Sequence, residues 1–470
     1  MIPLSVAELA SAVGGTVAGA DPDATVTAPA SVDSRAVEPG GLFVAFPGEN
    51  VDGHDYVAAA VEAGAVVALT TRTVEGSPCV VVADQFQALA KLARYVLDRL
   101  PELTVIGLTG SQGKSSTKDL IGQLVSALGP TVAPKGSFNN EIGHPLTALR
   151  CDPDTRFLVS EMGARHVGDI RYLTGITPPR VGLVLNVGSS HLGEFGSQDA
   201  IAVAKGELVE ELPAAGVAVL NADDQRVAAM ASRTKARVVT FGEAQTADVR
   251  ATGIALDERG RPGFTLHVGG EQHVVQLRLV GEHQVSNALA AAAVAHAVRL
   301  EPKAIADGLA AAEARSRWRM EVTDRADGVT VINDAYNANP DSVRAALKAL
   351  VAIGRAGRRR TWAVLGEMRE LGAASADEHD AVGRLAVRLD VNRLVAVGEG
   401  ARAIHLGAAH EGSWGEESAY ADSPEGALEL LRRELRPGDV VLVKASRAVG
   451  LETLAAALLA DAPATKETTA

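Results

Sequence analysis

The chain has 470 residues, longer than one hydrophobic core usually organises, so roughly two to four domains are expected. Hydrophobic residues make up 47% and charged residues 22%, a balance typical of a soluble globular protein with large cores. A formal net charge of −13 argues against duplex nucleic acid or an anionic membrane surface as the main partner. The two cysteines have no neighbours at metal or redox spacing, which indicates a reducing compartment and no disulfide framework.

No segment has the pattern of an export signal or a membrane span. The first residues, MIPLSVAELA, lack a basic region before the apolar ones, so a signal peptide is not expected. The longest nearly uncharged helical run, residues 288–298, is too short to span a bilayer. A cytoplasmic protein is therefore expected, without membrane insertion and with a monomer as the default state.

In chain order, the first predicted domain covers residues 1–83. Glycine and proline interrupt it often, and it contains SVDSRAVEPGGLFVAFPGENVDGHDYV. The segment from Asp84 to Leu100 has the pattern of a helix that ends at a proline, and it opens the second predicted domain, residues 84–314. A charged stretch around residues 313–319 separates that domain from the third, residues 315–470.

Short runs rich in valine and leucine alternate with alanine-rich stretches of helical spacing. The predicted strands are TVIGL (104–108), RFLVS (156–160), VGLVLN (181–186), GVAVLN (216–221), TWAVLG (361–366), RLVAVG (393–398) and VVLVKAS (440–446). Such alternation favours parallel sheets covered by helices, and hence an α/β fold.

The stretch TVIGLTGSQGKSST, residues 104–117, has the composition of a phosphate-binding loop. Glycines let backbone N–H groups approach phosphate oxygens, the next helix adds its dipole, and Lys114 neutralises charge. The hydroxyl of Ser115 can reach a magnesium ion. The general pattern requires glycine where this chain has Leu108, so a turn with an incidental lysine is the alternative. Three leucines are expected on one face of the following helix: Leu120, Leu124 and Leu128.

Polar residues follow two other predicted strands, at the edge where metal ligands collect in open α/β sheets. Glu161 comes directly after RFLVS, and Asn186 ends VGLVLN, with His191 in the loop beyond it. Taken singly, Glu161 could be a helix-capping acid and His191 a surface histidine. Their place beside the expected phosphates favours a functional role.

Lys205, in AKGELVEEL, has two interpretations. One is an exposed lysine paired with Glu207 or Glu210. The other is a residue at the metal site, where a lysine would be repelled by two divalent cations. It could serve there only as an anion, for instance after its neutral amine adds carbon dioxide.

Two later segments carry further candidates. In VINDAYNANPDSV a predicted strand ends in Asp334, and the polar residues that follow are Tyr336, Asn337 and Asn339. This is either a ligand loop or an ordinary Asn/Pro turn with a helix N-cap. In GEHQVSNALAAAA, Asn287 is either a base-reading amide or a helix cap.

Together these motifs resemble the Mur ligases, ATP-dependent amide-forming enzymes of bacterial cell-wall precursor synthesis. The likeness covers nearly the whole chain: DSR and LFVAFPGE in the first block; TGSQGKSSTK, FNNEIGHPLTAL, EMGARHVGDI, NVGSSHLGEFGS and AKGE in the second; NDAYNANPDSV, GEMRELG and VLVKASRAVGLE in the third. The family's glycine loop is itself T-G-x-x-G-K-[ST], so Leu108 is compatible with nucleotide binding. FNNEIG and DAYNANP favour the members that add D-alanyl-D-alanine.

The resemblance implies a fold of three domains. A central P-loop ATPase-like parallel sheet would be flanked by a small N-terminal α/β domain, which binds the UDP-sugar peptide, and by a C-terminal Rossmann-like domain. The implied reaction adds D-alanyl-D-alanine to UDP-N-acetylmuramoyl-tripeptide through an acyl phosphate, with ADP and phosphate as products. Alternatives are another Mur ligase, a folylpolyglutamate-type ligase, or a P-loop ATPase switch that performs no ligation.

The resemblance also implies roles for particular residues. The nucleotide would contact the glycine loop and residues from later segments: Gly110, Ser111, Gln112, Gly113, Lys114, Ser115, Ser116, Asn287, Arg319, Asp334 and Asn337. Two magnesium ions would be held by Ser115, Glu161, His191 and a carbamylated Lys205. The implied catalytic residues are Lys114, His191 and Lys205, and those near the UDP-sugar peptide are Ser34, Arg35, Asn139 and Asn140. The family commonly has asparagine where this chain has Gln284.

Overall fold

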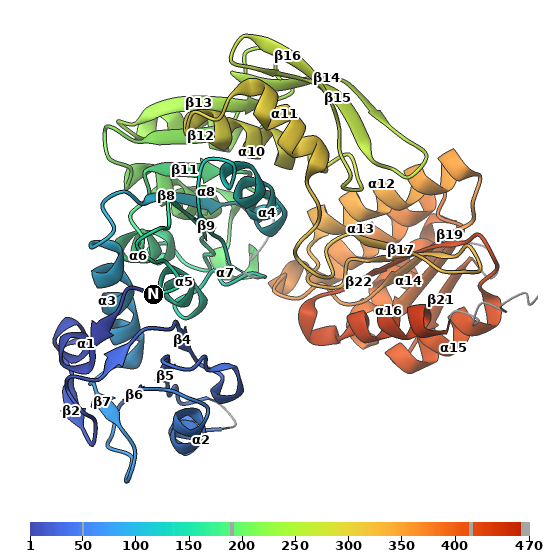
Figure 1. The fold of residues 1–470 in the computed structure, drawn as a ribbon. Coiled ribbons are helices and arrows are strands. Elements are labelled where there is room, and N and C mark those ends of the chain that lie inside the picture. The colour runs from blue at the N-terminus through green and yellow to red at the C-terminus, as the bar shows by residue number, and fades with distance from the viewer. Residues whose placement is uncertain (49–50, 135, 189–191, 413–416, 462–470) are drawn as a thin grey trace, which may run out of the picture.

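The computed structural model describes residues 1–48, 51–134, 136–188, 192–412 and 417–461. Three α/β blocks follow one another along the chain, coloured blue, green to yellow, and orange to red in Figure 1. Each block has its own mostly parallel sheet with helices packed on it. The predicted three-domain α/β fold is confirmed.

The N-terminal block is built on a five-stranded sheet in which only the β2–β7 pair is antiparallel. Its order is β2 (Thr16–Ala18), β7 (Cys79–Val81), β6 (Val67–Thr70), β5 (Leu42–Val44) and β4 (Ala30–Ser31). The other elements are β1 (Leu4–Ser5), β3 (Thr25–Val26), α1 (Val6–Val13), η1 (Ser34–Ala36), η2 (Gly53–Tyr56) and α2 (Val57–Glu62). The predicted helix after this block is α3 (Gln85–Leu97), with Asp84 as its N-cap. It ends short of Leu100 because a proline disfavours helical geometry in the residue before it.

The middle block carries a nine-stranded sheet. Its order is β16 (Glu271–Gln276), β15 (Pro262–Val268), β14 (Val249–Leu256), β13 (Arg237–Gly242), β12 (Val217–Asn221), β11 (Val181–Val184), β8 (Thr104–Thr109), β10 (Phe157–Glu161) and β9 (Thr131–Val132). The strands from β9 to β14 pair in parallel, whereas β15 and β16 pair antiparallel. The sheet is therefore mixed rather than wholly parallel, because tight turns connect its last three strands, and such turns can join only antiparallel neighbours.

Helices cover both faces of this sheet (Figure 1). They are α4 (Lys114–Val125), α5 (Gly143–Ala148), α6 (Asp169–Ile176), α7 (Leu192–Phe195), α8 (Gln198–Glu210), α9 (Gln225–Ala229), η3 (Met230–Arg233), α10 (Gln284–Ala297) and α11 (Pro302–Ala311). Leu120 and Leu124 are buried as predicted, but Leu128 is 40% exposed in the turn after α4. The prediction for Leu128 was wrong because the sequence Gly129-Pro130 follows, and neither residue continues a helix.

The strand order positions a binding site. The chain passes from β8 to β9 and β10 on one side, and then crosses to β11 on the other side of β8. At such a reversal the loops that leave the carboxyl ends of the strands diverge, which opens a crevice where ligands bind in α/β proteins. The loops after β8, β10 and β11 meet there.

The C-terminal block has a six-stranded sheet that is parallel except for the β17–β18 pair. Its order is β17 (Glu321–Asp324), β18 (Thr330–Asn333), β22 (Val440–Lys444), β19 (Thr361–Leu365), β20 (Arg393–Val397) and β21 (Ser418–Ala421). The helices are α12 (Pro340–Gly357), η4 (Gly372–Ala374), α13 (Ser375–Arg388), η5 (Glu399–Ala401), α14 (Arg402–Glu411), α15 (Pro424–Glu434), η6 (Arg447–Val449) and α16 (Leu451–Ala460).

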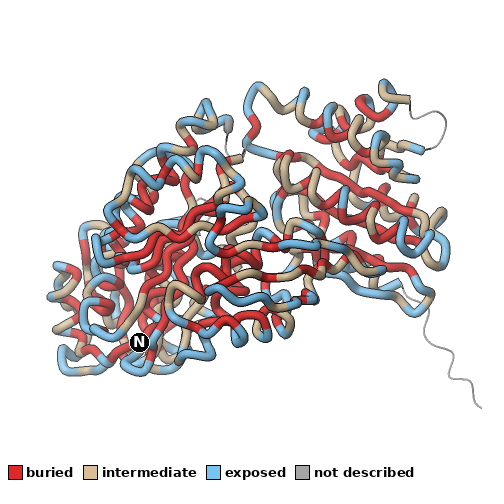
Figure 2. Tube along the Cα trace, turned by 90° about the horizontal axis from the view of Figure 1, so that it is seen from above, coloured by how far each residue is buried: buried red, intermediate tan, exposed pale blue. Residues whose placement is uncertain are grey.

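Figure 2 shows buried segments running through the interior of the molecule, with exposed segments along the outer turns. The alanine-rich helix α10 lies in this interior. All residues from Ala288 to Ala295 in α10 are buried, so the helix is enclosed by the sheet and by α4 and α11. No helix in the described part of the chain is long and apolar enough to cross a membrane.

Helices α13 and α14 pack through glycines. A Cβ on Gly383 would overlap the carbonyl oxygen of Ile404, and one on Gly407 would overlap the carbonyl oxygen of Asp380. Backbone atoms cannot move aside as a flexible side chain can, so this interface requires the missing methyl groups.

We expect Gly383→Ala to lower the free energy of unfolding by about 2 kcal/mol or more, although alanine is the better helix former. Thermal or denaturant unfolding measures the change. Gly175→Ala is the matched control, because Gly175 also lies in a helix but has no atom within 4 Å of an added Cβ. Equal stability of the two variants would contradict the packing argument.

Candidate active site

The glycine loop joins β8 to α4 and forms one wall of a cavity between the middle and C-terminal blocks. Gly113 is the N-cap of α4 with φ of +80°, and a Cβ there would overlap the side-chain oxygen of Asn287. A Cβ on Gly110 would lie 2.8 Å from the Cβ of Leu185. Glycine therefore permits both the left-handed turn and the close packing of the loop. The strand–loop–helix arrangement predicted for this stretch is confirmed.

Asn186 fixes the shape of the loop from the neighbouring strand. Its Oδ1 accepts hydrogen bonds from the backbone N–H groups of Ser111 and Gln112, both at 3.0 Å, and its Nδ2 donates to the carbonyl of Gln112 at 3.2 Å. The sequence placed Asn186 at a strand end but assigned it no role. The signal was available, since an amide at the end of an apolar strand usually has a polar partner nearby.

Glu161 ends β10 and faces Ser115 in the first turn of α4. Ser115 Oγ donates to Glu161 Oε2 at 2.9 Å, and Asn139 Nδ2 donates to Glu161 Oε1 at 2.8 Å. Only 1% of Glu161 is exposed. It caps no helix, so the interpretation of Glu161 as a capping acid is wrong, and the carboxylate faces the glycine loop as the functional interpretation expected.

Lys114 lies at the start of α4, where its Nζ donates to the carbonyl of Gly110 at 2.6 Å. Burial lowers the pKa of Lys114; the nearby Glu161 carboxylate opposes this shift and the Arg319 guanidinium adds to it. A second positive side chain thus lies close to the lysine that was expected to neutralise phosphate.

Lys205 lies in α8 and is only 3% exposed. Burial lowers its pKa well below the ordinary value, and the positive charge of Lys114 lowers it further. The interpretation of Lys205 as an exposed, paired lysine is wrong. Glu207 instead accepts from the backbone N–H groups of Gly168 and Arg171, because it caps α6, and Glu210 pairs with the Arg171 guanidinium.

Arg319 lies in the linker between α11 and β17 and joins the two domains. Its Nη2 donates to Ser137 Oγ at 2.7 Å, and Ser137 Oγ lies 2.8 Å from Ser115 Oγ. Its guanidinium carbon lies 4.1 Å from the ring centre of Tyr336, in the loop after β18. Arg319 Nε is buried and has no hydrogen-bond partner among the described residues, which is uncommon for a buried donor.

Asp334 forms an ion pair at the end of β18 that the sequence did not predict. Its Oδ2 lies 2.6 Å from Lys444 Nζ, and its Oδ1 accepts from the backbone N–H of Met320 at 3.0 Å. Lys444 also donates to the carbonyl of Asn337 at 2.9 Å. The pair therefore orders the loop. Lys444 was detectable as the polar residue at the end of the apolar run VVLVKAS.

The loop after β18 combines both interpretations offered by the sequence. Asn339 is the N-cap of α12 and forms a capping box with Ser342, as the turn interpretation required. Tyr336 and Asn337 line the cavity, as the ligand-loop interpretation required.

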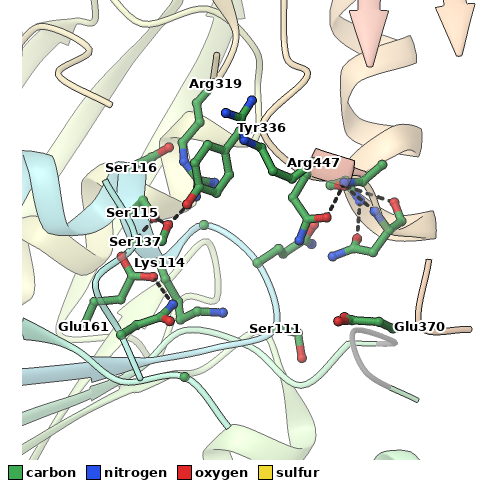
Figure 3. Close-up of a pocket in the computed structure, with 18 of the residues that line it drawn as sticks. Ser111, Lys114, Ser115, Ser116, Ser137, Glu161, Arg319, Tyr336, Glu370 and Arg447 are labelled. Carbon is green, nitrogen blue, oxygen red and sulfur yellow. Dashed lines mark hydrogen bonds between the residues drawn. The ribbon is translucent and has the colours of Figure 1, made fainter. Parts of the chain in front are cut away.

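The cavity has a volume of about 1060 Å³ and lies between the two domains. Figure 3 shows the glycine loop and Glu161 on one side, with Tyr336 and Arg447 of the C-terminal domain across from them. The structure brings most of the predicted nucleotide and metal residues to it: Ser111, Gln112, Gly113, Lys114, Ser115, Ser116, Glu161, Lys205, Asn287, Arg319, Asp334 and Asn337. Asn139 and Asn140 also line it.

Of the other predictions, the helix-cap interpretation of Asn287 is wrong, and Ser34 and Arg35 do not line the cavity. Asn287 lies inside α10, where it accepts from Thr117 Oγ1 and donates to Gln284 Oε1, so it is not a helix cap. Ser34 and Arg35 lie in η1 of the N-terminal domain, away from the lining of this cavity. His191 lies outside the described residues.

The possible metal ligands at the cavity include a carboxylate and a hydroxyl group, those of Glu161 and Ser115. Within the described residues, no group of three or more histidines, cysteines, aspartates or glutamates could hold a metal ion. A metal here would need other ligands besides Glu161, and the hydroxyl of Ser115 is the nearest oxygen donor.

Comparison with known proteins gives three matching family models in chain order. They are the Mur ligase family catalytic domain at residues 30–97, the Mur ligase middle domain at 108–295, and the Mur ligase glutamate ligase domain at 318–447. The Mycobacterium bovis protein named UDP-N-acetylmuramoyl-tripeptide–D-alanyl-D-alanine ligase is 52% identical over 98% of both chains. Its Escherichia coli counterpart is 35% identical over 97% of this chain and 99% of that one.

Solved structures agree with these matches. A crystal structure of MurF from Acinetobacter baumannii superposes with a TM-score of 0.87, with 34% identity and coverage of 97% of this chain and 99% of that one. MurF from Thermotoga maritima in complex with ADP superposes with a TM-score of 0.77, with 29% identity and coverage of 91% and 96%. The chain therefore belongs to the Mur ligase family and, within it, to the MurF ligases.

Proposed function

We propose that this chain is an ATP-dependent ligase that joins D-alanyl-D-alanine to the terminal carboxylate of UDP-N-acetylmuramoyl-tripeptide. The observation that carries the proposal is the cavity that the glycine loop shares with the C-terminal domain. The wall formed by the glycine loop fits a nucleoside triphosphate. The opposite wall belongs to the C-terminal domain, which can bring in a second substrate. The names of the most similar relatives support the same substrates.

The triphosphate is proposed to bind at the N-terminus of α4. Backbone N–H groups of the first helical turn point out of the helix, and the helix dipole favours an anion there. Asn186 holds the loop in this shape before any phosphate arrives, so less order must be created on binding. Lys114 and Arg319 supply positive charge close to the same place.

Magnesium fits the oxygen donors at this wall. Ser115 Oγ and Glu161 Oε2 are 2.9 Å apart, which matches the spacing of about 3 Å between adjacent ligands of an octahedral ion with bonds of about 2.1 Å. Both are hard oxygen donors, the kind that magnesium prefers. When bound, magnesium would neutralise phosphate charge during transfer. His191 stays a predicted second ligand outside the described residues.

Lys205 is proposed to carry a carbamate. Carbon dioxide adds only to the neutral amine, and burial favours that form. A bare lysine beside Lys114 would add positive charge where a cation must bind, whereas a carbamate would supply an oxygen ligand.

The first step of the reaction brings two anions together, the peptide carboxylate and the triphosphate of ATP. The peptide carboxylate attacks the γ-phosphorus of ATP, and ADP leaves with the electrons of the broken P–O bond. The amine of D-alanyl-D-alanine then attacks the acyl carbon, and the tetrahedral intermediate expels phosphate as the amide forms. Lys114, Arg319 and the N-terminus of α4 reduce the repulsion between carboxylate and triphosphate.

The C-terminal domain is proposed to close the cavity during this sequence, because an acyl phosphate exposed to water would hydrolyse. The two domains already touch on the far side of the cavity. Arg165 lies 3.5 Å from Glu370, and the backbone N–H of Gly193 donates to the Glu370 carbonyl at 3.3 Å. The N-terminal domain, with Ser34 and Arg35, is proposed to hold the UDP group, and a cytoplasmic monomer remains our prediction.

A phosphate-release assay tests the proposed reaction. With ATP and magnesium present, we expect phosphate release only when UDP-N-acetylmuramoyl-tripeptide and D-alanyl-D-alanine are both supplied. Omission of either substrate should reduce release to background. Steady ATP hydrolysis without the dipeptide would instead support the P-loop ATPase switch.

Lys205→Ala is expected to lower kcat by about a hundredfold or more, because a metal ligand is lost. Added formate or acetate should restore part of the activity, since a short carboxylate fits the space of the carbamate. Carbon-13 NMR with labelled bicarbonate should show a carbamate signal that this variant lacks. Lys303→Ala, on an exposed lysine, is the control. Full activity of Lys205→Ala without added carboxylate would contradict the proposed carbamate on Lys205.

Asn186→Ala is expected to weaken nucleotide binding about tenfold, because two N–H groups of the glycine loop lose their acceptor. Calorimetric titration with ADP and magnesium measures the change. Asn392→Ala is the matched control, since the Asn392 oxygen accepts from the backbone N–H of Thr361 in the C-terminal domain, away from the cavity. That variant should lose stability but retain affinity. Unchanged affinity in Asn186→Ala would contradict the role of Asn186 in shaping the glycine loop for nucleotide binding.

A further inference from the structure

We propose that Ser137 is a positioning residue that makes part of the nucleotide's binding energy depend on the magnesium ion. This inference rests on the proposed function, because it assumes a triphosphate at the N-terminus of α4. Ser137 lies in the loop between β9 and α5 and lines the cavity. Neither the sequence patterns nor the proposed reaction gave it a role.

A chain of hydrogen bonds runs through Ser137 from one domain to the other. It begins at Arg319 Nη2, passes through Ser137 Oγ at 2.7 Å and Ser115 Oγ at 2.8 Å, and ends at Glu161 Oε2 at 2.9 Å. Figure 3 follows these residues from Glu161 to Arg319, beside the ring of Tyr336. Ser115 and Glu161 are each only 1% exposed, so this end of the hydrogen-bond chain is protected from water, whereas Ser137 is half-buried.

Chemistry sets the direction of this chain. A guanidinium can only donate and an ionised carboxylate can only accept. Both hydroxyl groups must therefore donate their hydrogen bonds in the same direction, toward Glu161. Ser137 accepts from Arg319 and donates to Ser115, and Ser115 donates to Glu161. The Ser137 proton is therefore used in the bond to Ser115 and is not available to a ligand in the cavity.

A cation bound by Ser115 and Glu161 would reverse the direction of the hydrogen bond between Ser137 and Ser115, so that Ser115 becomes the donor. Ser115 Oγ would give a lone pair to such a cation, and its proton would then turn away from Glu161. The nearest remaining acceptor is Ser137 Oγ, which has two lone pairs. Ser137 would then accept from both Arg319 and Ser115, and its own proton would be free to bond an oxygen of the nucleotide phosphates.

The hydrogen bond that joins Ser137 to the linker between the domains keeps its direction. Ser137 remains an acceptor for Arg319 in both arrangements, so the guanidinium stays beside Tyr336. Ser137 therefore offers a new hydrogen bond only to a phosphate that binds together with the cation, because only its own proton changes direction. It offers little to a nucleotide that arrives without one.

Calorimetric titration with adenylyl imidodiphosphate, a non-hydrolysable ATP analogue, tests this inference without turnover. With magnesium, Ser137→Ala is expected to bind about tenfold more weakly than wild type, the loss of one hydrogen bond to a charged group. In EDTA the same substitution should change affinity by no more than about twofold. Ser137→Thr keeps the hydroxyl and should retain the magnesium-dependent affinity.

Ser126→Ala is the matched control, because Ser126 lies in the turn after α4 and its side chain donates only to the nearby carbonyl of Gln123. Thermal unfolding checks that each variant is folded, and Ser137→Cys replaces Ser137→Ala if the latter is not. Equal losses with and without magnesium, or no loss, would overturn the inference. Failure of the wild type to bind the magnesium complex would instead overturn the proposed function.

Discussion

A carboxylate must approach a triphosphate in the proposed reaction, and two anions repel each other strongly in a cavity with little water. The structure meets this constraint with cations that are expensive to bury. Lys114 and Arg319 lie close together at the start of α4, and burial lowers the pKa of Lys114, in a chain whose formal net charge is −13. Positive charge is therefore concentrated where the phosphates are proposed to bind, and the substrates complete an electrostatic arrangement that the protein alone leaves unbalanced.

The sequence was most informative where one short segment determines the geometry. The stretch from β8 to α4 was predicted correctly because glycine at a left-handed position, a lysine and a helix start lie within a few residues. Glu161 and Asn186 were placed at the correct edge because Glu161 ends β10 and Asn186 follows β11, the two parallel strands that flank β8. Such residues share one edge of the sheet whatever the rest of the chain does.

Contacts between distant segments were not predictable in this way. The Asp334–Lys444 pair and the Arg319–Ser137 bond join residues far apart in the chain, so no local spacing reveals them. The same limit explains the errors. Lys205 reads as a surface lysine beside two glutamates until α6 and α8 pack together and give Glu207 other partners. Asn139 was expected to face the UDP-sugar peptide, yet its amide contacts Glu161, and contact with that substrate stays a prediction.

An oxygen-18 transfer experiment tests the central claim most directly, namely that a peptide carboxylate attacks a phosphate held at the N-terminus of α4. The tripeptide substrate is labelled in both oxygens of its terminal carboxylate, and the released phosphate is analysed by mass spectrometry after one turnover. The account predicts one labelled oxygen in each phosphate, because the amine expels the oxygen that joined carbon to phosphorus. Amide product with unlabelled phosphate would contradict it.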